Sequence, residues 1–211
     1  MALLPYIMPV KTAAVLSAIS IFFISGTVCW KYRKSINYRV IIIPLFAALA
    51  FIHPGVYLLS IVNDQFFRKM LGLVIFLLTL LFLFIDKREI RIKPSLRNGF
   101  FAGATSGFLT GMFGVGGPPV VFYLLTAIED NIAFKASLEF VFIIQGAAML
   151  VSHGLSGNIE PNLTVYIVLS CLATVGGTLL GLKFFQNFDR NRLKQFVYCI
   201  MLILGILLIM K

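Results

Sequence analysis

The sequence predicts an all-α polytopic membrane protein with two inverted helical repeats, the second of which contains a broken, re-entrant glycine-rich helix. The first observation is composition: 60% of the 211 residues are hydrophobic and 12% are charged, against about 45–50% and 25% in soluble domains. The second is a series of apolar runs of membrane-spanning length, and the third is a cluster of glycines and prolines inside one such run. A soluble globular domain is therefore excluded.

Six apolar segments are long enough to cross a bilayer, and we expect helices because lipid offers no partner for unpaired backbone groups. They lie at 12–30, 40–62, 67–85, 132–153, 163–186 and 193–210. Residues 87–97 form a cytoplasmic basic linker. This linker separates a first repeat over 1–86, with three transmembrane helices, from a second over 98–211, with a broken helix and three more.

The region 98–127 differs from the other apolar segments because glycines and prolines interrupt its middle. Between Gly111 and Pro119 these residues disfavour a continuous helix. We expect one helix over 98–112, a glycine-rich break, and a second helix over 119–127 with proline in its first turn.

Weak internal repetition supports the two halves. Lys11–Ala14 aligns with Lys135–Leu138, and Phe67–Met70 aligns with Leu193–Phe196 after a two-residue insertion. The same three helices would therefore occur twice, with a broken segment only before the second set.

The distribution of basic residues predicts the topology. If the broken segment enters the membrane and returns, fourteen of the eighteen lysines and arginines lie on one side, whereas a crossing segment divides them ten to eight. The positive-inside rule favours the first arrangement. We therefore expect a hairpin open to the cytoplasm, six crossings, and inverted halves.

Glycines at 99, 103, 107 and 111 recur every four residues and leave one helix face without side chains. Such a face allows close helix packing, and it could also shape a permeation path. The small residues Ala173, Gly177 and Gly181 indicate the helix over 163–186 as its neighbour.

The break itself is the candidate site, because irregular backbone at membrane depth is tolerated only where protein buries it or a watery cavity adjoins it. Free amides at 114–117 and 120–122, with the positive end of the following helix, would bind an anion without a charged side chain. A purely structural kink is the alternative. The candidate substrate-binding residues are Gly111, Gly114, Gly116, Gly117, Pro118, Pro119, Val120 and Gln145.

Few ionisable residues lie within the apolar segments. Lys135 and Glu139 could form a structural pair one turn apart, or serve to attract the anion and couple its movement to protons. His53, before a proline, is a further coupling candidate, although such a histidine can simply satisfy freed backbone groups. Gln145 could line the path or form an interhelical hydrogen bond. We expect His153, at a helix end, to be interfacial.

The stretch from Gly107 to Leu125, followed by Lys135-Ala136-Ser137, resembles the glycine motif of the sulfite exporter TauE/SafE family. Matching the motif residue by residue implicates Gly111, Gly114, Gly116 and Gly117, with Pro118 where many members have a third glycine. The resemblance implies a secondary transporter of a small sulfur-containing or organic anion, such as sulfite or a sulfonate, in the cytoplasmic membrane. Its partners would be this solute, a coupling proton or ion, and the lipid bilayer.

The family carries the motif once per half, and this chain lacks the first copy. The alternative is therefore a non-transporting membrane interaction protein, or a truncated remnant of such a transporter. We expect no enzyme, because no set of nucleophile, base and acid shows a convergent spacing. No metal, cofactor or nucleic acid is expected, since Cys29, Cys171 and Cys199 lie in apolar runs and no basic face with aromatics exists.

Overall fold

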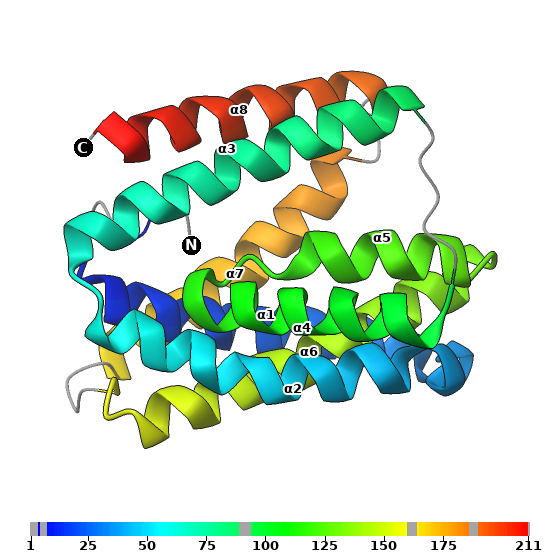
Figure 1. Cartoon of the computed structure of the whole chain (residues 1–211), viewed down its shortest axis with the longest axis horizontal. Helices are drawn as coiled ribbons and strands as arrows, with labels where there is room; N and C mark the ends of the chain where they lie inside the picture. Colours follow the sequence, from blue (N-terminus) through cyan, green and yellow to red (C-terminus); the bar gives the residue numbers. More distant parts are fainter. Residues whose placement is uncertain (1–3, 5–7, 89–93, 160–163, 186–189, 211) are drawn as a thin grey trace.

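The computed structural model describes residues 4, 8–88, 94–159, 164–185 and 190–210, and every element of regular structure in this part of the chain is a helix (Figure 1). The predicted all-helical class is therefore confirmed. The elements are α1 (Val10–Tyr32), the short 3-10 helix η2 (Arg33–Ser35), α2 (Tyr38–Ile61), α3 (Asp64–Arg88), α4 (Leu96–Phe113), α5 (Gly117–Ala127), α6 (Asn131–Leu155), α7 (Thr164–Phe185) and α8 (Arg190–Met210).

Each apolar segment that was expected to be helical is helical, with ends that differ by a few residues. Among the described residues, α1, α2, α3 and α6 contain stretches long and apolar enough to cross a membrane. The expected crossings over 163–186 and 193–210 correspond to α7 and α8, where residues 163, 186 and several side chains lie outside the described part. These two crossings remain predictions. Residues 89–93 of the expected linker also lie outside the description.

The helices form two groups (Figure 1). In one, α1, α2, α4, α5 and α6 pack together; in the other, α3 and α8 run side by side, and α7 passes obliquely between the groups. The α3–α8 contact is close, because a Cβ atom on Gly72 would lie 2.7 Å from the carbonyl oxygen of Gly205.

The glycine ladder of α4 packs on α2, so the expectation that its neighbour is the helix over 163–186 is wrong. A Cβ on Gly103 would lie 2.7 Å from the carbonyl carbon of Pro44, and one on Gly107 would lie 2.6 Å from the Cα of Ala48. Because α4 presents no side chains here, the backbone of α2 fills the space directly. From Gly103 to Gly107 on α4, the contacted residue on α2 moves from Pro44 to Ala48, so residue numbers rise in the same direction on both helices. The two helices are therefore parallel.

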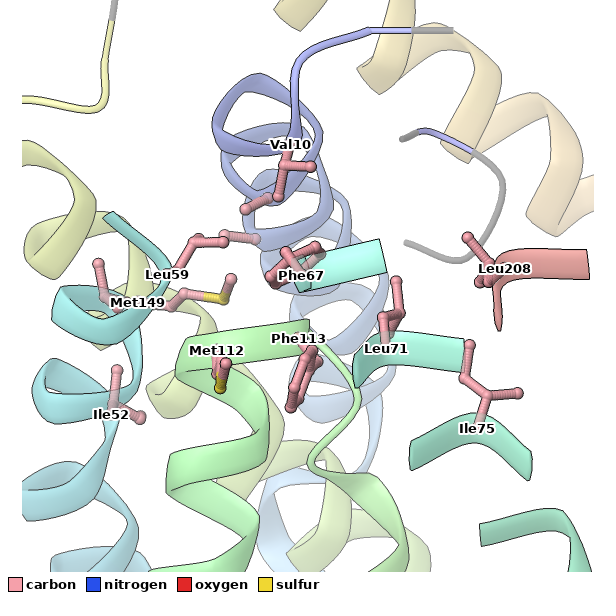
Figure 2. Packing of buried hydrophobic residues seen from close by; sticks show 13 residues of the cluster. Val10, Ile52, Leu59, Phe67, Leu71, Ile75, Met112, Phe113, Met149 and Leu208 are labelled. Atoms are coloured by element: carbon pink, nitrogen blue, oxygen red, sulfur yellow. The ribbon is translucent and has the colours of Figure 1, made fainter. Parts of the chain in front are cut away.

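The C-terminal end of α4 is held in an apolar cluster (Figure 2). Met112 and Phe113 lie among Ile52 of α2, Phe67 of α3 and Met149 of α6, all of them nearly inaccessible. Burial of these apolar side chains stabilises the packing of the end of α4 against α2, α3 and α6.

Candidate functional site

The predicted helix break is present between Phe113 and Gly117. Gly114 has φ 66°, a left-handed conformation that favours glycine. Its N–H donates to the carbonyl of Thr110 at 2.8 Å, and the N–H of Val115 donates to that of Leu109 at 3.4 Å. These two bonds cap α4. The expectation that the amides at 114 and 115 are free for a ligand is therefore wrong.

The start of α5 leaves two amides for a ligand. Gly116 is the N-cap, Gly117 is the first helical residue, and Pro118 and Pro119 have no N–H to donate. The amides at 120–122, which were also expected to be donors, come after the first four positions and bond within the helix. The N–H groups of Gly116 and Gly117 donate to no backbone carbonyl among the described residues. The positive end of the helix dipole lies at the same place.

A buried polar cluster lies directly beneath Gly116. The hydroxyl of Thr110 donates to Gln145 Oε1 at 3.1 Å, and Gln145 Nε2 donates to the Ser106 hydroxyl at 3.1 Å. All three side chains are buried. A Cβ on Gly116 would overlap the Thr110 hydroxyl and the Ser106 carbonyl, so only glycine allows this approach of α5 to α4.

Sequence reasoning selected Gln145 and missed Ser106 and Thr110. The interhelical hydrogen bond proposed as one of its two roles is present, because Gln145 joins α6 to α4. The missed signal was available: Ser106 and Thr110 are one turn apart and each directly precedes a glycine of the ladder.

A cavity of about 480 Å³ lies beside Pro118 and Pro119, between α3 and the α4–α5 pair. Its walls are mainly apolar, with Asn98 and Thr105 as polar exceptions. The lining residues are Leu78, Leu81, Phe84, Asn98, Phe101, Ala102, Thr105, Pro118, Pro119 and Phe122.

Two other candidate residues have packing roles. Val120 is fully buried in a second apolar cluster with Ile41 and Val141. Gly111 lies against α2, where a Cβ would overlap the carbonyl of Ile52. Neither residue offers a side chain to the cavity.

The predicted charged residues lie away from the break. The ammonium group of Lys135 is 5.8 Å from the ring centroid of Tyr32, at the end of α1. Glu139 is half-buried one turn later, and the helical rise places it about 9 Å along α6 from Gln145. Among the described residues, no hydrogen bond or ion pair joins Lys135 or Glu139 to Gly116 or Gly117.

The two histidines differ in exposure. His53 is exposed on the outer face of α2 and does not reach the break, whereas His153 is fully buried. His153 is buried because the turn after α6 folds back over it: the N–H of Asn158 donates to the His153 carbonyl at 3.0 Å. Its expected position at the membrane interface remains a prediction. Its Nδ1 lies 3.1 Å from Asn158 Nδ2, and its Nε2 has no hydrogen-bond partner among the described residues.

Comparisons with known proteins agree with the motif at the break. The family model described as sulfite exporter TauE/SafE matches residues 1–208. The chain is also similar to a protein of Cupriavidus necator described as a probable sulfite/organosulfonate exporter TauE, with 24% identity over 106 residues. That match covers 50% of this chain and 41% of the relative's length. No solved structure matches the chain.

Proposed function

Because the chain belongs to the sulfite exporter TauE/SafE family, we propose that it is a secondary transporter that moves a small sulfur-containing or organic anion across the cytoplasmic membrane. The observation that carries the proposal is the pair of free amides at Gly116 and Gly117, at the start of a helix and above a buried polar cluster. N–H groups at a helix N-terminus can bind an anionic oxygen without a charged side chain, as substrate sites in secondary transporters commonly do.

A re-entrant hairpin made of α4 and α5 is part of this proposal. The two helices are antiparallel, since Gly116 lies against Thr110 and Gly99 lies against the Tyr123 hydroxyl. The hairpin would begin and end on one side of the membrane. The site at its tip would then be reached through the cavity beside Pro118 and Pro119.

Inverted repeats are also part of the proposal, and the packing of α1 on α6 supports them. Tyr32, at the end of α1, contacts Lys135 at the start of α6, while Gly146 near the end of α6 lies against Phe22 of α1. The two helices are therefore antiparallel, as corresponding helices of two inverted halves would be. The hydroxyl of Ser137 accepts the N–H of Asn37 at 2.9 Å, so the basic loop after α1 and the start of α6 lie together.

Coupling to a proton or ion gradient completes the proposal. Glu139 is its carboxylate candidate, since it is half-buried on a helix long and apolar enough to cross a membrane. Lys135, four residues earlier and exposed, would attract anions toward that side.

The test is the flux of labelled sulfite into proteoliposomes, with Gly117→Pro and Gly117→Ala as matched variants. Proline removes the N–H at the first helical position, and because the ψ of 0° at Gly116 is disfavoured before a proline, the melting temperature of each variant is measured beside its flux. Alanine keeps the N–H, and its Cβ would lie 3.4 Å from Phe142 Cζ, an ordinary contact. Loss of a hydrogen bond to a charged group predicts a decrease in flux of about tenfold or more for Gly117→Pro and little change for Gly117→Ala.

Equal flux in both variants would rule out the amide site. If the folded wild-type protein moves none of a panel of sulfite, sulfonates and carboxylates, the proposal of transport fails. The glycine ladder would then be a packing feature of a non-transporting membrane protein.

A further inference from the structure

Five basic side chains gather where α1 ends and α6 begins. Lys31 lies in the last turn of α1, and Arg33 and Lys34 lie in η2. Arg39 follows in the first turn of α2, and Lys135 lies in the second turn of α6. All five side chains are exposed, and we refer to them as the basic cluster.

Contacts between distant segments hold the basic cluster together. The ring centroid of Tyr32 lies 5.5 Å from the ammonium group of Lys31 and 5.8 Å from that of Lys135. The N–H of Asn37 donates to the Ser137 hydroxyl at 2.9 Å, which joins the chain after η2 to α6. The basic residues of α1, η2 and α6 therefore cannot separate to relieve their mutual repulsion unless these contacts break.

The described carboxylates do not neutralise the basic cluster. Among the described residues, none of its five members forms an ion pair with an acidic side chain. Asp130 instead caps α6, where it accepts the N–H of Ala133 at 2.6 Å. Glu139 is half-buried, one turn beyond Lys135 on α6. The basic cluster therefore carries a positive charge that attracts an anion.

Trp30 indicates the depth at which the basic cluster lies in a bilayer. Its side chain is 74% exposed, and the guanidinium carbon of Arg33 lies 4.4 Å from its ring centroid. Tryptophan is enriched at the level of the lipid headgroups, and α1 is long and apolar enough to cross a membrane. Phe23, two turns earlier on α1, is also exposed, so apolar surface adjoins the basic cluster on its membrane side. The five charges would therefore lie level with the lipid phosphates.

We propose that the basic cluster binds the phosphate headgroup of an acidic phospholipid. The headgroup offsets the repulsion among the five cations, while the acyl chains pack on the exposed apolar side chains of α1. A soluble phosphate ion would gain the first interaction only. The binding requires a bilayer but no transport, so its test is independent of the proposed function.

The first test uses the fluorescence of Trp30, which is the only tryptophan in the sequence and therefore reports on this site alone. The protein is placed in vesicles of phosphatidylglycerol and phosphatidylcholine, with bromine, a contact quencher, on the acyl chains of one lipid at a time. Bromine on phosphatidylglycerol should quench Trp30 more strongly than bromine on phosphatidylcholine at the same mole fraction. The difference should shrink at high salt, since ions screen exposed charges. Equal quenching by the two lipids would overturn the proposal.

Two matched double variants locate the binding. Lys31→Gln with Lys34→Gln removes two charges of the basic cluster and keeps the guanidinium that contacts Trp30. The preference for phosphatidylglycerol should fall about fivefold or more, because one basic residue near an anionic membrane surface contributes about that factor. Lys11→Gln with Lys69→Gln removes the same charge from exposed positions at the other end of α1 and near the start of α3, and should leave the preference unchanged. Equal losses in the two variants would show that net charge alone attracts the lipid, and would overturn the site.

Inorganic phosphate separates a lipid site from a site for a soluble anion. Sodium phosphate and sodium chloride at equal ionic strength should reduce the excess quenching by brominated phosphatidylglycerol to the same extent, because both act only by screening. A greater reduction by phosphate would show that a free phosphate ion occupies the basic cluster, and would overturn the assignment to lipid.

Discussion

The ladder of glycines on α4 and the small residues of α7 are the same sequence feature with opposite outcomes. On α4, Gly103 and Gly107 lie against the backbone of α2 with no room for a Cβ atom. On α7, Ala173 is exposed, and a Cβ on Gly177 would meet no described atom within 4 Å. A row of small residues permits close approach, but the approach occurs only where the fold brings a second helix to that face.

The largest expected loss of stability comes from adding a methyl group to a glycine of α4 that packs against α2. Gly107→Ala would force α4 away from Ala48 and should lower the free energy of unfolding by about 3 kcal/mol. Gly177→Ala should change it by less than about 0.5 kcal/mol. Thermal denaturation in detergent measures both. A tolerated Gly107→Ala would mean that α2 and α4 are not in contact.

The same contrast applies to two adjacent residues at the break. The Cβ in Gly116→Ala would overlap the Thr110 hydroxyl, so this variant should lower the free energy of unfolding by about 2 kcal/mol. The Cβ in Gly117→Ala has ordinary contacts. Sulfite flux should fall with the first variant and not with the second. Identical melting temperatures for the two variants would contradict the close approach of α5 to α4.

The polar cluster beneath Gly116 is the next contact to test. Gln145→Leu leaves the hydroxyls of Thr110 and Ser106 without their hydrogen-bond partner. It should lower the free energy of unfolding by about 1.5 kcal/mol. Adding Thr110→Val should cost less than the sum of the single variants, because the two side chains share one hydrogen bond. Strict additivity in denaturation would show that the bond is absent.

The smallest change in the free energy of unfolding is expected for the two histidines, of which one is buried and the other exposed. His153→Leu removes the contact with Asn158 but also a buried nitrogen without a described partner, so the net loss should be about 1 kcal/mol. His53→Leu should have no measurable effect, since that side chain is exposed. A larger loss at His53 than at His153 would reverse the assignment of their environments.

The sequence by itself determined the helical class, the positions of the helices and the break in the glycine-rich segment. Each follows from local chemistry: apolar length, the cost of unpaired backbone in lipid, and the conformations open to Gly114 and Pro118. The family motif also lies within one stretch of chain.

Only the tertiary structure decided which helix contacts the ladder, which amides at the break are free, and which histidine is buried. Ser106, Thr110 and Gln145 meet from two helices, and a third helix forms one wall of the cavity beside Pro119. Such contacts depend on how distant segments pack, because small or polar side chains at helical spacing fit several neighbours equally well. The spacing of residues along one helix cannot choose among those neighbours.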